Sequence, residues 1–388
     1  MVTASRLAGL LLVLAGAAAA AEAPMPLTVQ PRALRGAGAM AESTPGTNEA
    51  PMAFPWVSGG APGVASRIND TIWLRELSLA PPLSAGNDFV LPADERLDRL
   101  GDVGFEVRRN DARVLSIGVH IEDCAGHCTT RGDELHFEPA TGRLLTIDDL
   151  FTAAGRRALE RRRAETAVAN YERALGTLPP EPKEPDEDDD NGEAASPPPP
   201  PAPPSNGWQD PDDAEMRAYF KRCIEGWRSG HLGGPVEMSL GADRGVHLEF
   251  AACSPGDRRE EAMIDAPPPP LLLPVPELTP LLTPFGRHVL LGEANGALPP
   301  PNPFGHLLHG RVGDSAVTLY LEEPFDESVE ATWFDDRVRR PVRLFGFYRA
   351  GVLDLTEDGP TGFLLQRQGA TLEGVRNSDG KRLPVRLE

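Results

Sequence analysis

Apolar residues recur at helical and at strand-like intervals through the first two thirds of the chain. The segment Ile68–Leu79 has apolar residues on one side of a helical projection, as expected for an amphipathic helix. The segments Phe105–Val107 and Val114–Ile121 alternate between apolar and polar residues, and the turn-forming run at 109–111 separates them. Together with a third candidate strand at Glu134–Glu138, they predict an antiparallel sheet beside a helix.

Two longer helical patterns follow this sheet. Asp148 is the expected N-cap of a helix that continues through residues 156–175, because a short acidic side chain accepts bonds from the first-turn N–H groups. A second helix is expected over Pro211–Arg228, with an apolar stripe that indicates core packing. Its stripe contains Met216, Tyr219, Phe220, Cys223, Ile224 and Trp227. Short strands at Val236–Leu240 and Val246–Ala251, and a short helix at Glu277–Leu282, complete a predicted α+β domain over residues 61–292.

The pattern changes after residue 303, where short apolar segments alternate with glycine-containing turns. The candidate strands are Val317–Leu321, Val342–Phe347, Val352–Leu355, Gly362–Gln366 and Leu383–Leu387. Strands at this spacing are typical of a small antiparallel meander or barrel. The sequence therefore predicts a second, all-β module over residues 303–388.

Proline and negative charge are concentrated between these patterns. The chain has 41 prolines and a formal net charge of −20, and 11 acidic residues with one lysine lie between Pro179 and Asp213. Because proline removes backbone donors and the acidic run repels itself, residues 179–210 are expected to be a disordered insertion, with an acidic binding segment as the alternative. Residues 22–60, which are rich in small residues, are expected to be a flexible lead-in. The charge argues against nucleic acid as a partner and favours cationic proteins.

The N-terminus has the features of a cleaved signal peptide. Arg6 precedes an apolar run from Leu7 to Leu14, and small residues follow. Since this run is short for an anchor, residues 1–21 are expected to be removed, with an uncleaved anchor as the alternative. Prolines interrupt Leu271–Leu282, so no stable membrane insertion is expected there. The mature protein is predicted to be periplasmic or secreted.

Four cysteines in an exported chain predict two disulfides, for which three pairings exist. We favour Cys124–Cys128 and Cys223–Cys253, because each pair then lies within one local unit. A metal site formed by Cys124, His127 and Cys128 is the alternative, although it lacks a spaced second pair of ligands.

The segment Val114–Phe151 carries a series of short motifs. They are Leu115-Ser116, Ala125-Gly126-His127, Thr141-Gly142-Arg143, Leu145-Thr146 and Asp149-Leu150-Phe151. In this order they resemble the extracytoplasmic domain of RsiV-like anti-sigma receptors and PdaC-type peptidoglycan deacetylases. The resemblance extends over Ile68–Leu291, with two departures: cysteines flank a turn that usually has glycines, and the acidic insertion is atypical. The last part of the chain is similar to a glycine-punctuated β module sometimes found after such domains.

This resemblance implies an α+β domain outside the cytoplasm with a role in cell-wall biology. In the receptor branch the domain recognises lysozyme, and in the deacetylase branch a separate catalytic domain performs the chemistry. The metal-binding motif of that catalytic domain and an anti-sigma segment are missing from this sequence, so neither activity is carried over. The candidate binding residues are Asp123, Gly126 and His127 at the disulfide-bridged turn, with a purely structural turn as the alternative.

Sequence signatures of catalysis are missing. The chain has no G-x-S-x-G elbow, H-E-x-x-H pair or phosphate loop, so no cofactor and no metal is expected. We therefore predict an exported non-enzymatic binding protein of the cell envelope, which recognises a cationic lysozyme-like hydrolase or a peptidoglycan fragment. The alternatives are a cell-wall-modifying hydrolase with dispersed catalytic residues and a structural envelope protein.

Overall fold

The computed structural model describes most of the two predicted folded regions. The described residues are 26–35, 52–83, 88–92, 97–124, 128–180, 213–230, 238–241, 245–248, 253, 271–294, 298–357, 361–378 and 380–388. The predicted signal peptide at residues 1–21 and nearly all of the predicted insertion lie outside them, as do Gly126 and His127. Along the described chain, α+β elements are followed by an all-β barrel, which confirms the predicted fold class.

The N-terminal sheet occupies part of the region that was predicted to be a flexible lead-in. Strands β1 (Thr28–Arg35) and β2 (Ala53–Ser58) pair antiparallel, and β3 (Asp88–Val90) pairs parallel to β1. The prediction for residues 22–60 is therefore wrong for these two strands. Each strand contains a proline, and Pro31 lies opposite Pro55. Because proline is rare within strands, its presence argued against a strand in this region.

Helix α1 (Val64–Leu77) and a three-stranded sheet form the first core. The 3-10 helix η2 (Leu97–Arg99) leads into the sheet, whose strands are β4 (Leu100–Asn110), β5 (Leu115–Cys124) and β6 (Cys128–Phe137) in that order. Its apolar residues are buried with those of α1 and of the N-terminal sheet. The helix predicted at Ile68–Leu79 and the predicted strand–turn–strand arrangement are thus confirmed, with the helix four residues earlier at its start and two at its end.

The long helical region contains a break that the sequence did not indicate. Helix α2 (Ile147–Leu150) has Thr146 as its N-cap in a capping box with Asp149, and α3 (Ala153–Thr177) has Thr152 as its N-cap. The prediction of Asp148 as the N-cap is therefore wrong. Asp148 instead lies one position into α2 and pairs with Arg156.

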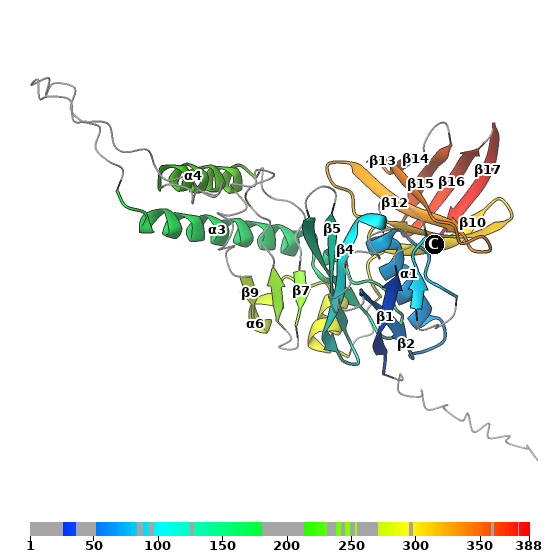
Figure 1. Ribbon diagram of the computed structural model, residues 1–388, viewed down its shortest axis with the longest axis horizontal. Helices are drawn as coiled ribbons and strands as arrows, with labels where there is room; N and C mark the ends of the chain where they lie inside the picture. Colours follow the sequence, from blue (N-terminus) through cyan, green and yellow to red (C-terminus); the bar gives the residue numbers. More distant parts are fainter. Residues whose placement is uncertain are drawn as a thin grey trace, which may run out of the picture.

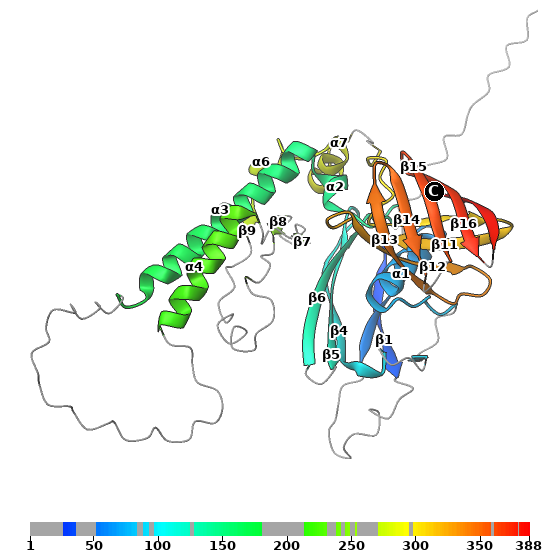
Figure 2. The same ribbon diagram turned by 90° about the horizontal axis from the view of Figure 1, so that it is seen from above.

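Helix α4 (Asp213–Ser229) packs on α3, and the two helices extend from the rest of the molecule as an arm, seen in green in Figures 1 and 2. The arm has a small core of its own, which includes Tyr219, Cys223, Ile224 and Trp227 of the predicted stripe. The disulfide Cys223–Cys253 closes this core, so the second predicted pairing is confirmed.

Short elements connect the arm to the barrel. Strands β7 (Met238–Leu240), β8 (Val246–Leu248) and β9 (Leu271–Leu273) form a small antiparallel sheet. They are followed by α6 (Val275–Leu278), α7 (Pro284–Gly286) and the π-helical turn η4 (Arg287–Leu291). The helix predicted at Glu277–Leu282 therefore begins earlier and ends at Leu278. A third core joins these segments to α2.

The C-terminal module is a closed antiparallel barrel, in which each strand pairs with the next and the last pairs with the first. The strands are β10 (His306–Val312), β11 (Ser315–Leu321), β12 (Ser328–Asp335), β13 (Val342–Arg349), β14 (Val352–Thr356), β15 (Gly362–Gln368), β16 (Thr371–Ser378) and β17 (Lys381–Leu387). Apolar side chains fill its interior. A Cβ at Gly346 would lie 1.8 Å from the carbonyl oxygen of Asp354, so the close approach of β13 and β14 requires glycine there.

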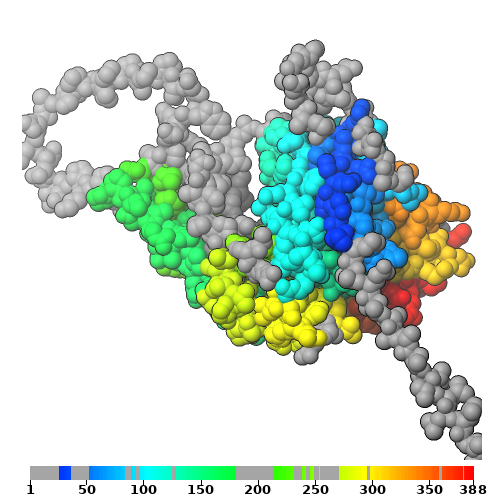
Figure 3. Space-filling view, turned by 90° about the horizontal axis from the view of Figure 1, so that it is seen from below, coloured from blue at the N-terminus to red at the C-terminus, as the bar shows by residue number. Residues whose placement is uncertain are grey.

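The barrel and the α+β domain share a core. Tyr320 and Phe334 of the barrel are buried among residues of α1 and the first sheets, and Arg339 lies 3.2 Å from Asp70 of α1. The barrel and the helical arm lie at opposite ends of the molecule (Figure 3). None of the helices in the described segments is long and apolar enough to cross a membrane.

Candidate functional site

A pocket of about 700 Å³ lies where the sheet β4–β6, the C-terminal end of α1 and the barrel meet. The sheet contributes residues from all three of its strands, and the barrel contributes the end of β11 and the residues after it. The charged residues of the lining are Arg75, Glu76, Glu106, Arg108, Arg131, Asp133, Glu134, Glu322 and Glu323. Six carboxylates therefore share the pocket with three arginines, and its lining is acidic.

The arginines of the pocket are already paired with carboxylates. Arg75 lies 3.2 Å from Asp133 and 3.3 Å from Glu76, and the Arg108 guanidinium donates a hydrogen bond of 2.6 Å to Glu134. Arg131 lies 3.9 Å from Asp133 and donates to the backbone carbonyl of Glu76. The six carboxyl groups of the pocket therefore outnumber the three arginines that line it with them.

Glu76 is the carboxylate whose environment is least suited to a charge. Its side chain is 1% exposed, and among the described residues neither of its oxygens has a partner with hydrogen-bond geometry, although Arg75 lies 3.3 Å away. Burial, reinforced by the nearby charge of Asp133, raises the pKa of Glu76 from its usual 4.5 to about 8, although Arg75 and Arg131 oppose the rise. A buried acceptor without a donor is costly, and a positively charged group entering the pocket would remove that cost.

The carboxyl groups on the barrel side of the pocket also have raised pKa values. Burial, and next the charge of Asp148, raise the pKa of Glu323 to about 7. Burial and the charge of Glu330 also raise the pKa of Glu322 above its usual value. Carboxyl groups from two structural units thus face one cavity with a reduced tendency to ionise, which is typical of functional sites.

A buried serine–histidine pair lies beside the pocket. Ser116 and His136 are joined by a hydrogen bond of 2.9 Å at Nδ1, and Nε2 of His136 lies 2.7 Å from the carbonyl oxygen of Met238. That carbonyl can only accept, so Nε2 donates and Nδ1 accepts from the serine hydroxyl. Burial lowers the pKa of His136 to about 4, and Ser116 is 0% exposed. The pair therefore ties β5, β6 and β7 together and presents no accessible nucleophile.

A second buried polar cluster explains several motifs of the segment Val114–Phe151. Asp149 accepts bonds of 2.8 Å from Arg143 and 3.0 Å from the Thr146 N–H, and His306 of the barrel lies 3.2 Å away. The neighbouring His309 instead contacts the Thr318 hydroxyl at 3.1 Å. The Thr-Gly-Arg, Leu-Thr and Asp-Leu-Phe motifs therefore have a structural role, because they join α2 to the first barrel strand.

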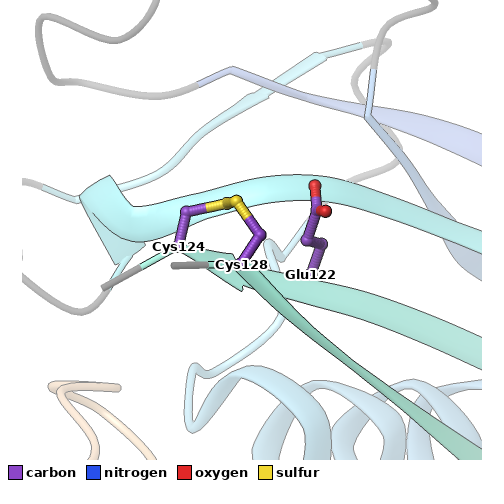
Figure 4. Close-up of side chains that lie close together, drawn as sticks. All are labelled: Glu122, Cys124 and Cys128. Atoms are coloured by element: carbon purple, nitrogen blue, oxygen red, sulfur yellow. A yellow bond between two sulfur atoms is a disulfide. The ribbon is translucent and has the colours of Figure 1, made fainter. Parts of the chain in front are cut away.

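Of the three sequence-predicted binding residues, the structure describes only Asp123, next to the last residue of β5; Gly126 and His127 lie outside the described residues. The predicted disulfide Cys124–Cys128 is present and joins the ends of β5 and β6, with Glu122 beside it (Figure 4). Glu122 and the two sulfur atoms are close enough to be considered metal ligands, but both sulfurs are bonded to each other and neither is a thiolate. Asp123 lies 3.4 Å from Arg99 and does not line the pocket.

Sequence analysis missed the carboxylates of the pocket. Glu76 stands between Leu74 and Leu77 at the end of a helix, where an acidic residue usually faces solvent. Glu322 and Glu323 follow a barrel strand and have no local pattern that marks them. The apolar residues Leu74 and Leu77 near Glu76 were the one local indication that it is buried. The contact between α1 and the barrel is a tertiary feature, which the local sequence does not show.

No family model matches the chain, and no curated protein matches it. The resemblance to RsiV-like and PdaC-type domains therefore remains a hypothesis based on the motifs themselves.

Proposed function

We propose that this chain is a non-enzymatic binding protein of the cell envelope, periplasmic or secreted, whose acidic pocket holds a cationic group of its ligand. The observation that carries this proposal is Glu76, a buried carboxyl group that lines the pocket and receives no hydrogen bond from the described residues. A lysine, arginine or amino group is the chemistry that complements it. Two disulfides in one chain are consistent with an oxidising compartment.

The proposed ligand is a lysozyme-like hydrolase, with a peptidoglycan fragment that carries free amines as the alternative. The motif resemblance of the segment Val114–Phe151 supports the first, and the acidic lining supports any cationic ligand. Enzymes of the lysozyme type are natural probes because they present many basic side chains on a rigid surface, and complementary charge increases the rate of association.

The test is calorimetric titration of the oxidised protein against a cationic lysozyme at low and near-physiological salt. We expect Glu76→Gln to weaken binding, which raises the dissociation constant at least about tenfold. The matched control is Glu327→Gln, an exposed carboxylate on the barrel that pairs with Arg349 and lies outside the pocket; it should bind like the parent protein. A variant that lacks residues 181–210 should also retain binding. If that deletion abolishes binding, the acidic insertion attracts the lysozyme and the pocket does not bind it.

Proton release gives a second measurement of the same proposal. At pH 7 Glu76, with its pKa raised to about 8, is largely protonated, and a bound cation favours the ionised form. Titrations in buffers with different heats of ionisation should therefore show protons released on binding by the parent protein and fewer by Glu76→Gln. Equal release by both would contradict a role for this carboxyl.

A cell-wall hydrolase is the second candidate. The observation that favours it is that Glu76 and Glu323, with pKa values of about 8 and about 7, face the same cavity, since a general acid must be protonated near neutral pH. Incubation with purified muropeptides tests it: catalytic turnover that disappears in Glu323→Gln would establish the enzyme, and no turnover would leave the binding protein.

A further inference from the structure

Strand β6 forms one edge of its sheet and borders the pocket. The sheet has the order β4–β5–β6, so β6 pairs with β5 on one side. On its other side, pairing within the described residues is limited to Phe137, which forms a bridge to Leu144. The carbonyl of His136 accepts a 2.7 Å bond from the N–H of Leu145 on that side, which identifies the backbone groups that face the edge.

Alternate residues of β6 direct their backbone groups to this edge. Because the register with β5 is continuous from Cys128 to Phe137, Gly132 and Thr130 have the same orientation as His136. For these two residues, the described part of the structure contains no bond toward the edge. A row of unpaired N–H and C=O groups is a template for an additional strand.

Within the described residues, the space beside this edge belongs to the acidic pocket. Gly132 lines that pocket. The flanking Asp133 and Glu134 also line the pocket, as do Glu76 and Glu323. An extended backbone lying along β6 would therefore place alternate side chains among carboxylates.

We propose that the edge of β6 at Thr130–Gly132 pairs with an extended segment of a partner protein that carries lysine or arginine at every second position. This inference rests on the proposed binding role of the pocket, and it adds that the partner binds as an extended strand. Backbone bonds to β6 supply affinity, and the alternate basic side chains, which lie on one face of a strand, supply specificity by reaching Glu76 and its neighbours.

Charge distinguishes this occupant from a second copy of the chain. A second β6 would bring its own acidic pocket toward the first, and like charges placed together oppose association. A basic segment instead meets an excess of carboxyl groups, one of which, Glu76, is buried and receives no hydrogen bond from the described residues.

The test uses three synthetic peptides with the sequence Thr-Lys-Val-Lys-Val-Lys-Thr, acetylated and amidated at their ends. One is unmodified, one is N-methylated at its second and fourth residues, both lysine, and one is N-methylated at its third and fifth residues, both valine. All carry the same charge, and the two methylated peptides are isomers, each of which has lost two N–H groups of one strand edge. We expect the unmodified peptide and one methylated isomer to bind, and the other isomer to bind at least tenfold more weakly. Equal binding by both isomers, or no binding by any peptide, would overturn the proposal.

Variants of the chain complete the experiment. Gly132→Pro removes one edge-directed N–H, whereas Gly132→Ala keeps it, so the alanine variant should bind the unmodified peptide at least tenfold more tightly. If the proline variant fails to fold, the pair of methylated peptides still decides the question. Lysozyme binding that depends on Glu76, together with equal binding of both isomers, would retain the proposed function and reject the strand pairing. Isomer-dependent binding without lysozyme binding would support the strand pairing and reject a lysozyme-like partner.

Discussion

The carboxylate of Asp149 joins the segment that contains Arg143 and Thr146 to the first strand of the barrel. It is 0% exposed and interacts with Arg143, with the Thr146 N–H and with His306 of the barrel. Removing one partner of a buried ion pair leaves uncompensated charge, which costs about 3–5 kcal/mol. We expect Asp149→Asn to lower the free energy of unfolding by that amount in urea denaturation. Asp148→Asn, whose partner Arg156 is half exposed, should cost less than about 1 kcal/mol. Equal losses would contradict the structural role of Asp149.

The same residue predicts a dependence on pH. Burial by itself raises the pKa of Asp149, but His306 and Arg143 outweigh it, and the folded-state pKa lies below the usual 3.8. The stabilisation is therefore fully present above the unfolded-state pKa and is lost as the pH falls through the folded-state value. Between pH 5 and pH 2, stability should fall more steeply for the parent protein than for Asp149→Asn.

The individual residues of the pocket show where inference from sequence stops. The disulfide pairs follow from their spacing, because each closes a local unit. Glu76 and Glu323 are brought together only by the contact between α1 and the barrel, and neither has a sequence neighbour that indicates the other. A charged residue at a helix end usually faces water, and the burial of Glu76 depends on elements more than two hundred residues away in the chain.

Among the elements, the α3–α4 arm is expected to behave as a separate unit. Its core is distinct from the others, and Cys223–Cys253 closes a sequence separation of 30, against 4 for Cys124–Cys128. In the chain-entropy relation these correspond to about 3.5 and about 2 kcal/mol. The double variant Cys223→Ala/Cys253→Ala should reduce hydrogen-exchange protection mainly in α4. The matched control, Cys124→Ala/Cys128→Ala, should leave α4 unchanged. Equal loss of protection in α4 and in the barrel would show that the arm is not independent.

The elements that were predicted correctly share strong local periodicity. Apolar and polar residues alternate through most of β5, and α4 has an apolar stripe whose residues Tyr219, Cys223, Ile224 and Trp227 are buried. Strand β12 was missed because Ala331 to Phe334 are buried on both faces, the barrel interior on one side and the shared core on the other, which removes alternation. Strands β10 and β16 were also missed; each contains a glycine at a close strand approach.

At the scale of the molecule, the sequence suggested two separate modules, over residues 61–292 and 303–388, whereas the structure joins them through a common core. Phe334 and Tyr320 belong to the core of α1, and the contacts of Arg339 with Asp70 and of His306 with Asp149 cross the same boundary. The pocket lies at this boundary. Its geometry therefore depends on the barrel as much as on the sheet, which is a physical reason for the barrel to accompany the α+β domain.

A shared core predicts cooperative unfolding of the barrel with α1. Phe363 lies in the barrel interior and does not belong to the core that contains α1. Truncation of such a residue to alanine costs about 3–5 kcal/mol. Hydrogen exchange followed by mass spectrometry should show that Phe363→Ala lowers the protection of α1 amides by the same free energy as that of β14–β16. Trp227→Ala, which removes a large side chain from the core of the arm, provides the control and should leave α1 protection unchanged. If Phe363→Ala instead reduces protection in the barrel alone, the two modules unfold independently and the boundary cannot hold the pocket in a fixed shape.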